Sequence, residues 1–189
     1  MPNRRRFLLT ALAAVMALSV VTPAFADTPA PMSSYKRTSQ TGAYVFVMLG
    51  RPDFGSESVG EWEGYTLSGL YRNDGSKDPI WTVDWYAYNV DVSMDGVHLV
   101  RHGGPTSGLD GEAISFYANG ELIRGYTVRD LVDDERGLTR SMTFLHWRRD
   151  GRFVDLRHEY MLFTLDGNAF TFDITSGEIV REFRAVPSR

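Results

Sequence analysis

The sequence predicts an all-β protein built from tandem antiparallel sheets, with about 10–12 short strands. One observation is an internal repeat, because residues 109–116 read LDGEAISF and residues 165–172 read LDGNAFTF. A second is the regular spacing of Asp-Gly, Asn-Gly and Ser-Gly pairs, which break the apolar runs into short segments. A third is that no segment longer than a few residues after residue 26 has helical periodicity.

The repeat extends on both sides of this segment. Residues 120–124 (GELIR) return as residues 177–181 (GEIVR). Upstream, an Asp-Gly pair and an Arg-His pair recur: Asp95-Gly96 with Arg101-His102, and Asp150-Gly151 with Arg157-His158. The offset of about 56 residues indicates two tandem copies of one supersecondary unit, over residues 83–126 and 139–183.

Residues 1–26 have the pattern of an export signal. Three arginines (residues 4–6) precede an apolar run (residues 7–21), and Ala-Phe-Ala at residues 24–26 suits a signal peptidase. The segment Arg-Arg-Arg-Phe-Leu (residues 4–8) resembles the twin-arginine export motif, although three arginines also suit the general secretion route. We therefore expect a periplasmic or secreted protein whose mature form has no membrane span.

Each predicted element follows from its local pattern. Residues 27–42 are polar and lack periodicity, so they are expected to be a flexible leader before one all-β domain at residues 43–189. A divergent sheet over residues 43–86 would precede the two repeats. Expected strands are residues 43–49, 65–72, 80–86, 89–93, 97–102, 112–118, 121–126, 140–147, 153–157, 159–165, 169–174 and 178–183. The capping-box spacing of Thr127 and Asp130 predicts one helical turn at residues 127–132.

Composition narrows the class of protein. The chain has no cysteine, which excludes disulfides and a lipid anchor on cysteine, so its stability must come from its core. The formal net charge of −4 becomes more negative once the three arginines of the signal are removed. An acidic chain lacks the basic footprint of a nucleic-acid-binding protein, and we expect no nucleic-acid partner.

Two segments resemble blades of β-propeller proteins. Residues 92–100 (VSMDGVHLV) resemble the signature of YVTN-type propellers, and residues 172–180 (FDITSGEIV) resemble the last strands of tryptophan-aspartate or quinoprotein-type blades. The resemblance implies blade-like four-stranded sheets and identifies no family of known function. Since propellers close with about 4–8 blades, this chain is too short for a ring. It predicts an open partial propeller, with a sandwich or a partly open barrel as alternatives and self-association as the route to a ring.

The two Arg-His pairs are the first candidate site. If the repeats are related by pseudo-symmetry, Arg101, His102, Arg157 and His158 could face one groove and bind an anion or a carboxylate. The alternative is that they are strand-end residues, repeated because the unit was duplicated. Adjacent residues of a strand point to opposite faces, which argues against a joint site.

The second candidate is the aromatic cluster of Trp81, Trp85 and Tyr86, which could stack on a glycan. The alternative is that the tryptophans belong to the core.

No cofactor or metal site is expected, because the sequence contains no zinc spacing, calcium loop, phosphate loop or nucleophile motif. The catalytic residues are unknown, and the sequence favours a non-catalytic binding module whose partner is a glycan or an envelope protein. A polysaccharide hydrolase or lyase using Asp84 or Asp91, and a subunit of a self-assembled ring, are the alternatives.

Overall fold

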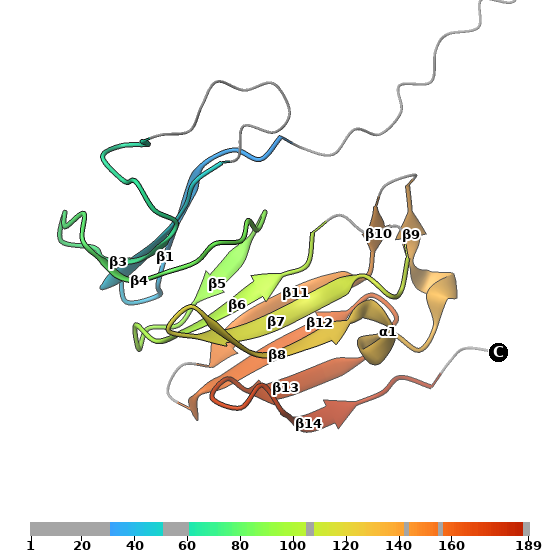
Figure 1. Cartoon of the computed structure of the whole chain (residues 1–189). Helices are drawn as coiled ribbons and strands as arrows, with labels where there is room; N and C mark the ends of the chain where they lie inside the picture. The colour runs from blue at the N-terminus through green and yellow to red at the C-terminus, as the bar shows by residue number, and fades with distance from the viewer. Residues whose placement is uncertain (1–30, 51–60, 105–107, 142–143, 155–156, 187–189) are drawn as a thin grey trace, which may run out of the picture.

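The fold is all-β, as the repeat and the turn spacing predict. The computed structural model describes residues 31–50, 61–104, 108–141, 144–154 and 157–186. These residues form fourteen strands, slightly more than expected, in antiparallel sheets (Figure 1). The first sheet contains β1 (Tyr35–Thr38), β2 (Tyr44–Met48), β3 (Gly69–Arg72) and β4 (Pro79–Thr82). The second contains β5 (Val90–Val92), β6 (His98–His102), β7 (Glu112–Ala118) and β8 (Glu121–Thr127). The third contains β11 (Arg148–Val154), β12 (Glu159–Thr164), β13 (Ala169–Asp173) and β14 (Ile179–Phe183).

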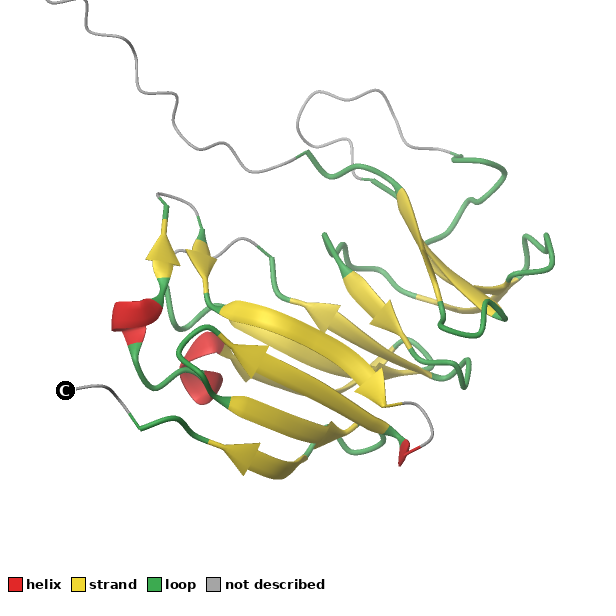
Figure 2. Ribbon diagram, turned by 180° about the vertical axis from the view of Figure 1, so that it is seen from behind, coloured by secondary structure: helices red, strands yellow, loops and turns green. Residues whose placement is uncertain are grey.

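The strands of each four-stranded sheet follow one another in chain order, as in a propeller blade. A two-stranded ribbon of β9 (Thr139–Arg140) and β10 (Leu145–His146) joins the second sheet to the third and extends beyond them (Figure 2). It is preceded by α1 (Val128–Leu131) and by the short 3₁₀ helix η1 (Glu135–Gly137). The expected helical turn is confirmed, with the Asp130 carboxylate accepting hydrogen bonds from the backbone N–H and the hydroxyl of Thr127, each at 2.7 Å.

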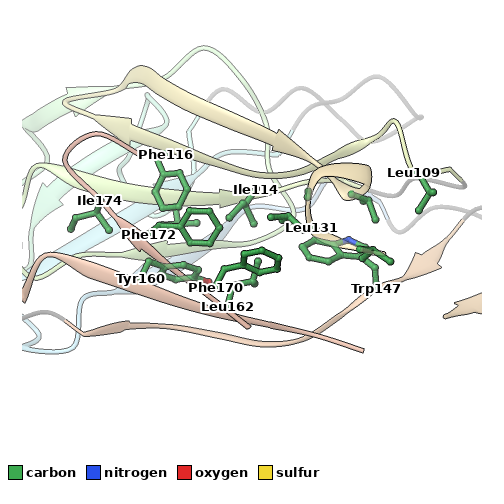
Figure 3. Packing of buried hydrophobic residues seen from close by; sticks show 14 of the residues in the cluster. Leu109, Ile114, Phe116, Leu131, Trp147, Tyr160, Leu162, Phe170, Phe172 and Ile174 are labelled. Atoms are coloured by element: carbon green, nitrogen blue, oxygen red, sulfur yellow. The ribbon is translucent and has the colours of Figure 1, made fainter. Parts of the chain in front are cut away.

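The second and third sheets pack face to face around the larger core. Figure 3 shows Phe116 and Ile114 of β7 pointing toward Phe172, Phe170 and Tyr160 of the third sheet. The Phe116 and Phe172 rings have centroids 5.0 Å apart, and both side chains are fully buried. Leu131 of α1 and Trp147 close one end of this core.

The opposite face of the second sheet packs against the first sheet. Alternation along β6 and β7 divides their side chains between two cores, because Val100 and Phe116 belong to the core just described while Leu99 and Tyr117 belong to a second one. The second core includes Phe46 and Trp81 of the first sheet. The second sheet is therefore the middle layer of an open stack.

The outer face of the first sheet is covered by its own chain. Tyr65 is buried against Tyr71 with ring centroids 4.8 Å apart, and Trp62 pairs with Tyr65 through an isolated β-bridge. The Lys77 ammonium lies 3.5 Å from the centroid of the Tyr65 ring, a cation–π contact. The outer face of the third sheet carries half-buried Phe163, with the Arg149 guanidinium 5.4 Å from its ring centroid.

The duplicated segment occupies equivalent places in the second and third sheets. Phe116 lies on the third strand of one sheet and Phe172 on the third strand of the other. Phe116 pairs with Val100, and Phe172 pairs with Tyr160. The rings of this repeated segment are thus buried at equivalent positions, and the divergent sheet expected before the repeats is present as β1–β4.

The proposed equivalence of the two Arg-His pairs is wrong. His98 pairs with Ala118, and the His158 carbonyl accepts a hydrogen bond from Ile174 N–H, so His98 and His158 are the equivalent residues. Asp95-Gly96 forms the turn between β5 and β6, whereas Asp150-Gly151 lies within β11. The connection from β6 to β7 is longer than the connection from β12 to β13. Residues upstream of these connections are therefore out of step with the offset between Phe116 and Phe172.

Several local predictions also change. The strand expected over residues 140–147 is the ribbon of β9 and β10, and the strand expected over residues 153–157 is β11, which begins at Arg148. The leader expected over residues 27–42 contains β1, whose residues pair with β2 from Tyr35↔Met48 to Thr38↔Val45. The strand expected over residues 80–86 is β4 and ends at Thr82, because the following residues leave the sheet and pack between the first two sheets. The predicted signal at residues 1–26 lies outside the described residues. Within the described ranges, no helix is long and apolar enough to cross a membrane.

Candidate functional site

A polar cluster joins the second and third sheets at the edge of their shared core. Asp91 on β5 and His102 on β6 come from the second sheet, while Arg148 on β11 and Tyr160 on β12 come from the third. Period-two alternation turns Asp91 toward the third sheet, since its neighbours Val90 and Val92 belong to the core with the first sheet. The cluster therefore depends on the packing of two sheets, and no local stretch of sequence contains it.

Asp91 is the acceptor at the centre of the cluster. Its Oδ2 accepts a hydrogen bond from the Tyr160 hydroxyl at 2.7 Å and another from His102 Nε2 at 2.9 Å. Burial raises the pKa of the Asp91 carboxyl, against the lowering effects of the Tyr160 hydrogen bond and of the charges on Arg148 and Arg37. Its Oδ1 has no protein donor among the described residues, so this oxygen is available to a ligand.

Tyr160 is a fixed donor rather than a base. Its side chain is fully buried, and burial, followed by the neighbouring charge of Asp91, raises the pKa of its hydroxyl well above the ordinary value. Gly151 on β11 makes room for this hydroxyl, because a methyl group at Gly151 would lie 2.3 Å from the Tyr160 oxygen. The absence of a side chain at Gly151 thus lets the Tyr160 hydroxyl reach Asp91.

His102 is held by hydrogen bonds at both ring nitrogens. The Arg148 Nη1 atom contacts His102 Nδ1 and lies 3.1 Å from Nε2. Arginine can only donate, and the Asp91 carboxylate can only accept. Arg148 therefore faces Nδ1 as a donor, and Asp91 faces Nε2 as an acceptor.

A cleft of about 170 Å³ opens beside Asp91, where the first strands of all three four-stranded sheets meet. We name it the Asp91 cleft. It is lined by Thr38 of β1, Gln40, Asp91 and Val92 of β5, and Gly151, Arg152 and Phe153 of β11. Arg152 is exposed, and its guanidinium forms no hydrogen bond or ion pair with any described residue.

The structure separates Arg101 from His102, as strand alternation predicts. Arg101 faces the first sheet, where its guanidinium forms a bidentate pair with Glu112, with Nε–Oε1 at 2.9 Å and Nη2–Oε2 at 2.5 Å. It also lies 4.9 Å from the centroid of the Trp85 ring. These contacts give Arg101 a structural role. Among the binding candidates named from the sequence, His102 alone reaches the polar cluster, where it meets Asp91, an acid named for the hydrolase or lyase alternative.

The second Arg-His pair is not part of this polar cluster, although it directly precedes β12, the strand of Tyr160. Arg157 and His158 are exposed in the turn between β11 and β12, and His158 has a positive φ of 54°. His158 Nδ1 is 4.0 Å from Asp95 Oδ2, and Asp95 is held by His98 Nδ1 at 2.6 Å. The four residues of the two Arg-His pairs therefore do not form one anion site.

The aromatic candidates mostly serve the core between the first and second sheets. Trp81 is 7% exposed, and its indole N–H donates to the Gly96 carbonyl at 3.1 Å. Trp85 is half-buried and stacks on Phe46 with ring centroids 6.1 Å apart. Tyr86 is half-buried and donates its hydroxyl to the Ser33 carbonyl at 2.9 Å. Trp81 and Trp85 thus form no exposed stacking platform.

Sequence reasoning named Asp91 only as a residue to test and missed Arg148, Arg152 and Tyr160. The available signal was Asp91 itself, an acid between two valines on a short strand, since a strand buried on both faces needs a partner for such a carboxyl. Nothing in the sequence identifies that partner as Tyr160, which lies 69 residues away.

No family model matches this chain, and no curated protein matches it. Among the described residues, no group of three or more histidine or acidic side chains is arranged to hold a metal ion.

Proposed function

We propose that this protein is an exported, non-catalytic binding module of the cell envelope and that the Asp91 cleft is its ligand site. The observation that carries the proposal is the meeting of three first strands at a cleft whose central carboxylate, Asp91, is fixed by His102 and Tyr160 on one oxygen and open on the other. A carboxylate held in one orientation is prepared to accept a hydrogen bond from a ligand.

The ligand class follows from the lining. Thr38 and Gln40 supply hydrogen-bonding groups, Arg152 supplies a donor, and Phe153 and Val92 supply apolar surface. A largely polar lining with a smaller apolar part suits a hydroxyl-bearing ring such as a sugar. The volume of about 170 Å³ is below the usual range for drug-sized ligands, so the cleft would take a single unit.

Binding accounts for the cluster better than catalysis. A nucleophile activated by His102 would need its free ring nitrogen, and Arg148 occupies Nδ1. Glycoside hydrolysis usually needs a pair of carboxyl groups, and Asp91 is the one acid among the described residues that line the cleft. Tyr160 donates to Asp91 and has a raised pKa, which makes it unsuitable as a base.

A glycan array probed with the purified full-length protein tests the proposal. We expect saturable binding without product formation, and we expect Asp91→Asn to weaken it. Asp78→Asn, which removes an exposed acid away from the cleft, is the matched control. Product formation that Asp91→Asn abolishes would instead support the polysaccharide hydrolase or lyase. Binding that survives Asp91→Asn and Arg152→Gln unchanged would place the ligand elsewhere.

A further inference from the structure

The charge around the Asp91 cleft is opposite in sign to that of the chain. The protein has a formal net charge of −4. Yet Arg152 lies in the cleft lining beside Asp91, the acid of the cleft. Arg148 and Arg37 are also close enough for their positive charges to lower the pKa of the Asp91 carboxyl. Three arginines against one carboxylate leave a local excess of positive charge, which attracts an anion.

These three arginines differ in what they already bind. Arg148 contacts His102, and Arg37 donates from Nε and Nη2 to Asn89 Oδ1 at 3.1 and 2.7 Å. Arg152 has no partner among the described residues and lies at the cleft. Because a guanidinium binds a carboxylate through two parallel hydrogen bonds, Arg152 is the residue best placed to bind an acidic ligand.

Asp91 restricts which anion can enter. Its Oδ1 needs a donor, and its negative charge would repel a ligand that presents only acceptor oxygens, such as a phosphate dianion. The ligand must therefore present a donor to Asp91 and a negative charge to Arg152. A sugar ring with a carboxylate satisfies both requirements, because its hydroxyl groups donate and its carboxylate accepts.

We infer that the Asp91 cleft binds an acidic sugar unit, with a ring hydroxyl on Asp91 and the sugar carboxylate on Arg152. This inference rests on the proposed function and deepens it. Phe153 and Val92 supply the apolar lining for the C–H face of the ring. The partner is then a polysaccharide or glycan that contains uronic acid units.

Three sugars of similar size separate the contribution of the carboxylate from that of the ring hydroxyl groups. They are glucuronate, its methyl ester and glucose. The affinity of the full-length protein for each is measured by NMR titration at neutral pH. We expect glucuronate to bind about tenfold more tightly than the ester or glucose, a usual effect of one charge-assisted hydrogen-bonded pair. Arg152→Gln should abolish this preference while binding of glucose remains.

The control is Arg149→Gln, which removes an exposed arginine that stacks on Phe163 on the outer face of the third sheet. It should leave the preference for glucuronate intact. Equal affinities for the three probes, all weakened by Asp91→Asn, would overturn the acidic-sugar inference and leave the proposed cleft standing. If no probe shifts any resonance of the cleft residues, the proposed site fails as well.

Discussion

The Tyr160 hydroxyl donates to Asp91 Oδ2 at 2.7 Å and so links the third sheet to the second across the edge of their common core. The two residues are 69 positions apart in the chain. A partly buried carboxylate that loses a donor keeps much of its desolvation cost, so this hydrogen bond stabilises the packing of the two sheets.

Removing that hydroxyl tests its contribution. Tyr160→Phe should lower the free energy of unfolding by about 1.5–3 kcal/mol, the range for a hydrogen bond to a charged group. The matched control is Tyr71→Phe, another buried tyrosine, whose hydroxyl donates to the neutral Leu67 carbonyl at 2.7 Å and should cost about 0.5–1.5 kcal/mol. Urea unfolding of both variants and of the wild type measures the two losses in the free energy of unfolding. A smaller loss for Tyr160→Phe than for Tyr71→Phe would mean that Asp91 is not the charged acceptor assigned above.

A substitution at Gly151 tests the position of the Tyr160 hydroxyl independently. Gly151→Ala places a methyl group 2.3 Å from the Tyr160 oxygen, so we expect a loss of about 1–3 kcal/mol from overpacking. Gly108→Ala is the control, since its methyl group would meet nothing within 4 Å. Because the clash involves the hydroxyl, Gly151→Ala should cost less in a Tyr160→Phe background than in the wild type. Additive losses in the double-mutant cycle would show that the two residues do not interact.

The duplicated phenylalanines should act as a pair. Phe116→Ala and Phe172→Ala remove rings that are 5.0 Å apart and fully buried, so each should cost about 3–5 kcal/mol. The double variant should lose less than the two losses combined, because the rings contact one another. Phe183→Ala removes a ring that is 64% exposed and should change stability by less than about 0.5 kcal/mol. A loss below about 1 kcal/mol at either buried position would contradict the core described here.

Asp95 predicts a pH dependence of stability. Burial of its carboxyl acts to raise the pKa, but hydrogen bonds from the His98 side chain and from the backbone N–H groups of His98 and Val97 outweigh it and lower the pKa below 3.8. A carboxyl whose pKa is lower in the folded state stabilises the protein above its unfolded pKa, and this contribution is lost as the pH falls toward the folded value.

Asp95→Asn should therefore cost about 1–2 kcal/mol at pH 6, and the difference from wild type should shrink below about pH 4. Unfolding by urea at pH 6 and at pH 3 measures both values, with Asp78→Asn as the control for the loss of one exposed acid. A difference that is equal at the two pH values would show that ionised Asp95 is not the stabilising form.

The sequence was sufficient for what depends on local pattern. The Leu-Asp-Gly repeat placed Phe116 and Phe172 on equivalent strands because a turn followed by alternating apolar residues sets the face of the next strand. The same reasoning failed for Arg157, because the connection from β6 to β7 is longer than the connection from β12 to β13, and sequence spacing does not carry across such a difference.

The candidate site depends on contacts that no local pattern contains. The recurring Arg-His pair drew attention to His102, but the structure shows that the two pairs do not occupy equivalent positions. Tyr160 looked like any alternating core residue of a strand, and its role follows from the position of Asp91 on a different sheet. Such a pairing is set by the way that two sheets stack, which alternation within each strand does not determine.

The chain order of the strands has a consequence for how the protein folds. Within every four-stranded sheet each strand pairs with the strand before it, so the backbone hydrogen bonds of a sheet link neighbouring segments of the chain. Contacts of low sequence separation form quickly, because closing a short loop costs little entropy. Each sheet can therefore form on its own. The Asp91–Tyr160 contact joins two sheets, so it forms only after both sheets have formed and docked. Docking of the sheets is thus the step expected to limit the folding rate.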